Sequence, residues 1–399
     1  MRDPRHVEGA DVLIGDTPAA TLRRRDGGID FTYRAEHLAA NGRAVATSLP
    51  LTDEPVRTLG GALPPFFSGL LPEGRRLSGL RAAVKTSADD ELSLLLAVGE
   101  DPVGDVRVVP EGTDPESLSA GGGVETGHPT WEDMDFGDLL ATSGIDPSAL
   151  AGVQDKVSGR MLTLPLVHGG RCHLLKLDPP EYPHVVENEA FFLDLARGLR
   201  HPVVRSEVVH DRHGRSGLLV TRFDRHVVDG AIHRSAVEDG AQLLGRYPAD
   251  KYTVTTEHLI RRIGEVAPAR LPAVRAVLQQ VALAWLTGNG DLHAKNVSVV
   301  RDAGEWRVAP IYDIPSTLPY GDHRLALRIG GRDDSLSRKR WLALAEEVGL
   351  APRAAERALD DVLTVTSDVA DRAVDAIPMT PRAARDVRRV LRRRHDLMT

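Results

Sequence analysis

The segment from Gly288 to Asp313 constrains this chain more than any other part of its sequence. It opens with the residues GNGDLHAKN, in which Asp291 is followed five positions later by Asn296. The apolar run Val297–Val300 then predicts a strand, and Asp313 stands seventeen positions after Asn296. An Asp and an Asn at this spacing, followed by a hairpin and a second Asp, are typical of loops that orient a hydroxyl group and hold metal ions for phosphoryl transfer. The segment therefore favours a phosphotransferase over a polar turn that merely contains these residues.

A lysine on an internal strand is the next requirement of such a site. Side chains alternate between two faces along the strand predicted over Cys172–Leu177, so Lys176 points into a cleft or into water. The helix predicted over Glu187–Leu199 offers Glu189 in its first turn, with Asn188 as a local cap. We expect Lys176 to hold nucleotide phosphates and to pair with Glu189. The alternative is an edge-strand lysine that limits aggregation.

The composition limits the classes of protein to which the chain can belong. Its 399 residues carry 50 Lys and Arg against 57 Asp and Glu, a net charge of −7, and 42% are hydrophobic. These values suit two or three folded lobes rather than disorder. The single Cys172 excludes a disulfide scaffold and a four-cysteine zinc site. The sequence shows no apolar run of membrane-spanning length and no secretory leader, so we expect a cytoplasmic protein without a membrane partner.

Shifts in composition along the chain predict four segments. Residues 1–110 alternate short apolar runs with Gly, Pro and Asn, as a small α+β subdomain does. Residues 111–135 are rich in Gly, Ser, Thr and acidic side chains, and we expect a linker or loop there. Two predicted hairpins flank a helix in residues 136–230, and residues 231–399 are mostly helical apart from the segment described above. The expected fold class is α+β.

Further motifs lie along the whole chain. They are SLPL at 48–51, FFSGLLPEG at 66–74, AGVQDK at 151–156, LLK at 174–176, ENE at 187–189, RFDR at 222–225 and Tyr312-Asp313. Together with the loop at 288–296, they make the chain resemble the HipA family of serine/threonine kinases, the toxin halves of bacterial toxin–antitoxin modules. The resemblance implies a two-lobed protein-kinase-like fold with an extra N-terminal α+β subdomain and a mostly helical C-terminal lobe.

The resemblance also implies a role for each motif, with ATP as the phosphoryl donor and Mg²⁺ as the metal ion. Asp291 would be the catalytic Asp, and Asn296 and Asp313 would hold metal. The other implied positions are Lys295 beside the phosphoryl charge, His293 as a support of the loop, Lys176 and Glu189 at the phosphates, Gly152, Val153, Gln154 and Lys156 in a phosphate loop, and Thr221, Phe223 and Asp224 around adenine and ribose.

The family resemblance implies partners and a form of regulation. The protein would phosphorylate a serine or threonine of a protein substrate, such as an aminoacyl-tRNA synthetase, and so arrest growth. A HipB-like helix-turn-helix antitoxin would neutralise it and link it to operator DNA. Ala149 stands where the family commonly carries an autophosphorylated Ser, and Ser148 is the nearest hydroxyl. Self-phosphorylation at Ser148 and regulation by the partner alone are both open.

Two other functions compete with this one. The run GDLH at 290–293 also resembles the loop of small-molecule phosphotransferases such as aminoglycoside and choline kinases. Those enzymes lack an N-terminal lobe of this size and a loop like AGVQDK. The third interpretation is a non-catalytic corepressor that acts only with an antitoxin, and the complete set of kinase-type residues argues against it.

Arginine accumulates near the end of the chain. Seven arginines lie between residues 381 and 395. On a helix, most of them share one broad face, opposite Val387, Val390 and Leu391. A solvated helix end and a contact with operator DNA or a tRNA-bearing partner both fit this pattern.

Overall fold

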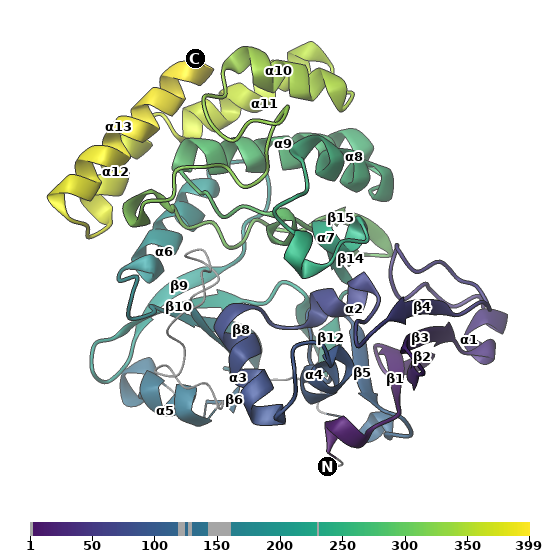
Figure 1. Ribbon diagram of the computed structural model, residues 1–399. Coiled ribbons are helices and arrows are strands. Elements are labelled where there is room, and N and C mark those ends of the chain that lie inside the picture. The colour runs from purple at the N-terminus through teal and green to yellow at the C-terminus, as the bar shows by residue number, and fades with distance from the viewer. Residues whose placement is uncertain (1–2, 119–123, 127–129, 143–160, 230) are drawn as a thin grey trace.

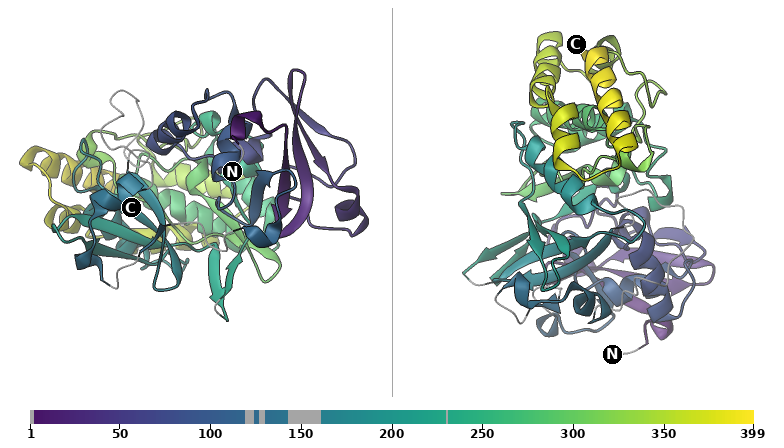
Figure 2. Two further views of the ribbon diagram at one scale, coloured as in Figure 1. Left: turned by 90° about the horizontal axis from the view of Figure 1, so that it is seen from below. Right: turned by 90° about the vertical axis from the view of Figure 1, so that its left-hand side faces the viewer.

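The computed structural model describes residues 3–118, 124–126, 130–142, 161–229 and 231–399 (Figure 1). In the orientation of Figure 1, two β-sheets with short helices form the lower half and most of the long helices form the upper half. Figure 2 shows that the last two helices lie at the end of the molecule away from the N-terminus. Within the described ranges, no helix has both the length and the apolar character needed to cross a membrane.

The N-terminal sheet has five strands in the order β4-β3-β2-β1-β5. Its strands are β1 (Gly9–Ile14), β2 (Thr17–Arg25), β3 (Gly28–Tyr33), β4 (Val56–Leu59) and β5 (Val106–Pro110), and its helices are α1 (Ala35–Ala39), α2 (Pro65–Leu70), α3 (Gly74–Val84) and α4 (Glu91–Val98). The ring of Phe31 in β3 lies 5.4 Å from that of Phe67 in α2, between ring centroids. These aromatic side chains and the leucines of α4 form a core separate from the rest of the described chain.

The second sheet also has five strands, in the order β6-β7-β8-β10-β9. They are β6 (Val124–Glu125), β7 (Leu162–His168), β8 (Arg171–Leu177), β9 (Ser206–His210) and β10 (Ser216–Thr221). Alternate residues of β10 enter different cores: Leu219 packs in the core of α5 (Phe136–Thr142), whereas Leu218 and Val220 pack in that of α6 (Val185–Ala196). The sheet is therefore covered by a helix on each face.

Part of the segment 111–135 belongs to this second sheet. The sequence predicts a linker or loop there, but β6 pairs in parallel with β7 through Val124 and Glu125. Two residues of extended backbone are enough to extend an existing sheet edge, although they leave no periodic pattern in the sequence.

Residues 231–399 enclose the largest core. The helices are α7 (Gly240–Leu243), α8 (Thr256–Val266), α9 (Arg270–Thr287), α10 (Arg338–Glu347), α11 (Pro352–Val365), α12 (Val369–Ala376) and α13 (Pro381–Met398). Every residue of α9 from Val277 to Thr287 is buried, because other elements cover this helix on all sides. A helix so enclosed gives a rigid base to the loop that follows it.

Two smaller sheets interrupt this helical half. One is the hairpin of β11 (Arg225–Val228) and β12 (Ala231–Arg234), and the other has the order β13-β14-β15, with β13 (Val237–Asp239), β14 (Ser298–Asp302) and β15 (Glu305–Val308). The strand and hairpin predicted after Asn296 are present, but β15 begins and ends earlier than the predicted Arg307–Ile311. The sequence did not predict β11, β12 or β13.

The arginine-rich end of the chain forms α13, and its arginines do not all face solvent. Arg388 and Arg392 donate hydrogen bonds to Asp371 of α12. Arg394 is instead buried, with its guanidinium 3.9 Å from the ring centroid of Trp285 and a hydrogen bond of 2.8 Å to the Trp285 carbonyl. At least one arginine of the predicted solvated face therefore fixes α13 to α9.

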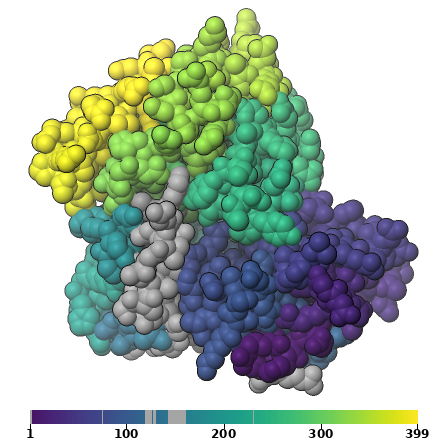
Figure 3. Space-filling view, in the orientation of Figure 1, coloured from purple at the N-terminus to yellow at the C-terminus, as the bar shows by residue number. Residues whose placement is uncertain are grey.

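The N-terminal subdomain docks against the helical half. In Figure 3, its purple and blue residues lie directly against green residues near position 250. The Gln242 amide of α7 donates to the Phe66 carbonyl of α2 at 2.8 Å. The hydroxyl of Thr47 donates to Glu238 of β13 at 2.7 Å. The docking therefore uses polar contacts to two elements that neighbour the catalytic-type loop.

Candidate active site

Three charged side chains from distant parts of the chain meet between the second sheet and the helical half. Lys176 lies near the end of β8, and its ammonium donates to both carboxylate oxygens of Glu189 in α6, at 2.7 and 3.0 Å. The same ammonium donates to Asp313 at 2.8 Å. Lys176 is 9% exposed and Glu189 is fully buried. The structure thus joins the strand lysine and the helix glutamate named from the sequence, and adds Asp313 to them.

Burial and mutual charge set the pKa values of this cluster. Burial alone would lower the pKa of Lys176, but the carboxylates of Asp313 and Glu189 raise it above its ordinary range. Burial raises the pKa of Glu189, although the charge of Lys176 opposes the rise. Burial would also raise the pKa of Asp313, but Lys176 holds it below its ordinary value. The ammonium therefore stays charged, and Glu189 is the carboxyl that accepts a proton more readily.

The loop after α9 places Asp291. Gly288 ends the helix in the left-handed conformation, with φ at 71°, and a Cβ there would lie 2.3 Å from the Leu318 side chain. Glycine is the residue that fits both conditions. The backbone N–H of Asp291 donates to Asn289 at 2.8 Å, and its carboxylate accepts a hydrogen bond of 2.9 Å from the Tyr252 hydroxyl. The carboxylate is thereby held in a fixed orientation.

Asn296 and Asp313 are in direct contact. The Asn296 amide donates a hydrogen bond to the carboxylate oxygen of Asp313 that Lys176 does not contact. Asp313 has φ at 56°, a left-handed conformation that few residues other than glycine adopt. Such conformations persist where the surroundings hold them and are concentrated at functional sites. An amide and a carboxylate side by side offer the oxygen donors that hard cations prefer.

His293 supports the loop through its backbone and its ring. Its N–H donates to the Asn296 side chain at 3.3 Å, and its carbonyl accepts from the Asn296 N–H at 3.0 Å. Its ring makes an edge contact with Tyr252, with 5.1 Å between centroids. Burial, together with the nearby charge of Lys251, lowers the pKa of His293 to about 3. The imidazole is therefore neutral at physiological pH.

Lys295 faces the N-terminal subdomain. Its ammonium donates to the Gly69 carbonyl at 2.9 Å, lies 2.9 Å from a carboxylate oxygen of Glu73, and lies 3.8 Å from Asp239. Lys251 pairs with the other oxygen of Glu73. A contact between Lys295 and a phosphoryl group, which the resemblance implies, would replace one of these interactions and stays a prediction.

The segment after β10 carries the residues named for adenine and ribose. Thr221 is the last residue of β10. The ring of Phe223 stacks on Tyr312, with 5.6 Å between centroids and 27° between planes, so it lies beside the residue that precedes Asp313.

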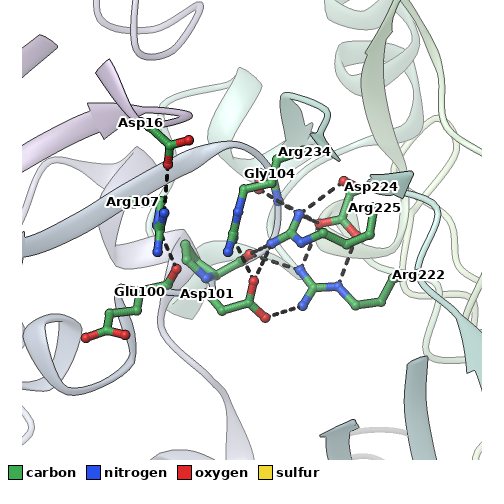
Figure 4. Close-up of polar contacts among 10 residues, drawn as sticks. Asp16, Glu100, Asp101, Gly104, Arg107, Arg222, Asp224, Arg225 and Arg234 are labelled. Carbon is green, nitrogen blue, oxygen red and sulfur yellow. Dashed lines mark hydrogen bonds and ion pairs between the residues drawn. The ribbon is translucent and has the colours of Figure 1, made fainter. Parts of the chain in front are cut away.

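Asp224 lies in a different cluster, shown in Figure 4. Asp224 is 3% exposed, and its carboxylate accepts hydrogen bonds from Arg222, Arg225 and the Gly104 N–H. Arg222, Arg225 and Arg234 also bind Asp101 of the N-terminal subdomain. A bond from Asp224 to ribose would displace one of its present partners, and this role too stays a prediction.

One expectation about α6 was wrong. Asn188 does not cap this helix, which begins at Val185; it lies inside and is fully buried. Its amide group exchanges two hydrogen bonds with the backbone of Ser316, at 2.9 and 2.8 Å. The first turn is instead capped by the carboxylate of Asp178, which accepts the N–H groups of His184 and Val186. Asn188 therefore anchors the segment that follows Asp313.

Several sequence-derived positions lie outside the described residues, namely Ser148, Ala149, Gly152, Val153, Gln154 and Lys156. Conversely, the sequence analysis did not single out Tyr252, Lys251 or Asp101. The motif FFSGLLPEG did contain Glu73, but nothing in it indicated that Glu73 reaches the loop.

Comparisons with known proteins agree on one family. Models described as the HipA N-terminal domain and the HipA-like C-terminal domain match residues 10–109 and 148–370. "Putative kinase Y4mE" of Sinorhizobium fredii is 30% identical over 375 residues, which cover 88% of each chain. "Serine/threonine-protein kinase toxin HipA" of Shewanella oneidensis is 28% identical over 291 residues, 67% of this chain and 66% of that protein. The solved complex of Shewanella oneidensis HipA, HipB and operator DNA contains a chain that matches with a TM-score of 0.78 at 20% identity, covering 97% of this chain and 96% of that one.

Proposed function

Because the chain belongs to the HipA family, we propose that it is an ATP-dependent serine/threonine protein kinase that arrests growth as a toxin. Its fold is the two-lobed kinase-like fold with an added N-terminal α+β subdomain and a mostly helical C-terminal lobe. The observation that carries the proposal is the bridge formed by Lys176 between Glu189 and Asp313, with Asn296 on the second oxygen of Asp313.

The donor set fits a nucleotide with a divalent cation. Lys176, oriented by Glu189, would hold the α- and β-phosphates of ATP. The oxygens of Asp313 and Asn296 would hold Mg²⁺, and the hydrogen bond that now joins these two side chains would give way to the ion. When bound, the ion neutralises negative charge on the phosphates.

In this proposal, Asp291 orients the attacking hydroxyl. Its carboxylate is buried and fixed by the Tyr252 hydroxyl, so the substrate serine or threonine meets a preset acceptor. Catalysis is then mainly positioning of the hydroxyl against the γ-phosphate. The backbone of Thr221 and Phe223 would meet adenine, and the loop at 151–156, which includes Gln154, would cover the phosphates.

The test is transfer of label from [γ-³²P]ATP to the proteins of a bacterial extract. The wild-type protein should label extract proteins on serine or threonine in a Mg²⁺-dependent manner. Asp291→Asn should reduce the rate by about 10²–10⁴-fold, the range of a positioned acid–base group. Labelling of aminoglycosides or choline in place of protein would favour the small-molecule phosphotransferase. The absence of any Asp291-dependent labelling would contradict both enzymes.

We further propose a HipB-like antitoxin as partner in the cytoplasm, with operator DNA bound through the complex. The support is the family and the solved Shewanella oneidensis relative, which is a complex of HipA with HipB and operator DNA. Where the gene beside this one encodes a small helix-turn-helix protein, co-expression of that protein should restore growth of cells that express the wild-type chain. Growth arrest that is unchanged by Asp291→Asn would instead support the non-catalytic corepressor.

A further inference from the structure

The N-terminal subdomain places one carboxylate beside the catalytic loop. The chain that follows α2 carries Glu73, which joins two lysines of the helical half. One carboxylate oxygen lies 2.9 Å from the ammonium of Lys295, the residue before Asn296. The other pairs with the ammonium of Lys251. The Gly69 carbonyl, in α2 just before this segment, accepts a hydrogen bond from Lys295 at 2.9 Å.

Both lysines are connected to the catalytic loop. Lys295 is itself a loop residue. Lys251 belongs to a segment that contacts the loop twice: its carbonyl accepts from the Ala294 N–H at 3.3 Å, and the hydroxyl of its neighbour Tyr252 donates to Asp291 at 2.9 Å. Glu73 is therefore connected, through one lysine on each side, to both ends of the functional run from Asp291 to Asn296.

Charge makes this connection difficult to replace. Burial would raise the pKa of Glu73, but Lys295 and Lys251 hold it at about 2, so the group is ionised at neutral pH. Without this charge, two largely buried ammonium groups would lie near each other, with Asp239 left as an acidic neighbour of Lys295 at 3.8 Å. Like charges in a buried site repel strongly, and the lysines would move apart.

We propose that Glu73 is a positioning residue for phosphoryl transfer, which fixes Lys251 and Lys295 so that Asp291 and Asn296 keep their working arrangement. The inference rests on the proposed kinase function and deepens it. It makes the N-terminal subdomain a part of the catalytic centre rather than a module that is merely attached to it.

The chain offers a matched control for simple docking. Thr47 also joins the N-terminal subdomain to the helical half, through Glu238, but it contacts neither lysine. Thr47→Ala removes the side-chain bond and weakens docking at a second point of the same interface. A role of Glu73 in docking alone would make the two variants similar.

The experiment uses the full chain and measures the rate at which extract proteins are labelled over a range of Mg²⁺–ATP concentrations. Glu73→Gln should lower the maximal rate by about a hundredfold, the loss expected from a misplacement of about 1 Å. The KM for ATP should change by less than about threefold, because the contacts of Lys176 remain. Glu73→Asp should recover part of the rate, and Thr47→Ala should stay close to wild type. Thermal unfolding identifies any variant that fails to fold. If Glu73→Gln fails to fold, the rate of Glu73→Asp is compared with that of the wild type in its place.

A double variant tests whether Glu73 and Lys251 act as one unit. Lys251→Met alone should cause a loss similar to that of Glu73→Gln, and adding it to Glu73→Gln should cause little further loss. The inference would be overturned if the losses of the two single variants multiplied in the double variant. It would also be overturned if Glu73→Gln kept the wild-type rate, or if Thr47→Ala lost as much rate as Glu73→Gln. In each of these cases the kinase function would stand. If the wild-type protein labels nothing, the proposed function itself fails and the inference fails with it.

Discussion

The cluster around Lys176 and the cluster around Asp101 are both buried and ionic, yet their charges are balanced in opposite ways. In the first, one ammonium is shared by the carboxylates of Glu189 and Asp313. In the second, which we call the hinge clamp, Asp101 and Asp224 face the guanidinium groups of Arg222, Arg225 and Arg234 (Figure 4).

This difference distinguishes the proposed metal site from a cluster that also joins two parts of the fold. The surplus carboxylate of the Lys176 cluster suits an incoming cation, and Asp313 is held there in a left-handed conformation. In the hinge clamp, the arginines also donate to the carbonyl of Pro102, at 3.0 Å from Arg222 and 2.7 Å from Arg225, which joins the subdomain to the segment after β10. Burial of charge alone is therefore weak evidence of function. Whether a cluster has an excess of negative or of positive groups is more informative.

The largest expected effect is that of Asp313→Asn on activity. The amide removes the charge proposed to hold Mg²⁺, so phosphoryl transfer should fall by about a thousandfold or more. Glu189 still pairs with Lys176, so the free energy of unfolding should change by no more than about 1 kcal/mol. Labelling from [γ-³²P]ATP and urea unfolding measure the two quantities. Asp302→Asn, in the exposed part of β14, is the control and should alter neither.

The converse variant is Asp101→Asn in the hinge clamp. Three arginines lose a buried carboxylate, so the free energy of unfolding should fall by about 3–5 kcal/mol. The rate of labelling per folded molecule should fall much less than in Asp313→Asn. Asp16→Asn is the control, since its side chain is 79% exposed and its pair with Arg107 should contribute less than about 1 kcal/mol. Equal destabilisation by Asp101→Asn and Asp313→Asn would remove the distinction between the hinge clamp and the cluster around Lys176.

One carboxyl from each cluster, Asp224 and Glu189, should also respond to acid in opposite directions. Burial would raise the pKa of Asp224, but Arg222 and Arg225 hold it at about 2. Its stabilising contribution, about 2 kcal/mol by linkage, is present above its ordinary pKa and is lost as the pH falls toward 2. The pKa of Glu189 is raised by burial, so its contribution grows as the pH falls and is lost as the pH rises through the folded-state pKa.

Urea unfolding between pH 7 and pH 3 measures both responses. Asp224→Asn should flatten the acidic end of the stability curve, and Glu189→Gln should flatten the portion closer to neutrality. If both variants changed the pH dependence of the free energy of unfolding in the same way, the opposite pKa shifts of Asp224 and Glu189 would be contradicted.

The smallest expected effect concerns Tyr252. Tyr252→Phe removes the hydroxyl that orients Asp291, and a hydrogen bond to a charged group is worth about 1.5–3 kcal/mol. Labelling should fall by about tenfold, with little change in unfolding. Tyr320→Phe, which removes a hydroxyl bonded to the exposed Pro183 carbonyl, is the matched control and should label at the wild-type rate.

The sequence predicted those parts of the candidate site that local patterns specify. Asp291, Asn296 and Asp313 lie in one short segment with a recognisable spacing, and Lys176 and Glu189 lie on consecutive elements. Contacts that were missed join segments far apart in the sequence: Glu73 and Lys251 are 178 residues apart. The hydrophobic periodicity within a strand or helix does not indicate such a contact.

The missed elements have a similar cause. The strands β11 and β12 are largely exposed, so they lack the alternation that identifies a strand with one buried face. The residue type of Asn188 suits a helix cap, whereas its tertiary contact with Ser316 determines its place. The domain boundaries and the residue roles, by contrast, stay predictions.

The long separations within the candidate site bear on when it can exist during synthesis. Lys176 meets Asp313 across 137 residues, and the loop of Glu73 meets Lys295 across more than 200. A nascent chain shorter than 313 residues lacks the side chain that Lys176 and Asn296 share. Contacts of this range also form late, because loop-closure entropy must be overcome first. During synthesis, the candidate site can therefore be completed only after Asp313 has been made, when most of the chain already exists.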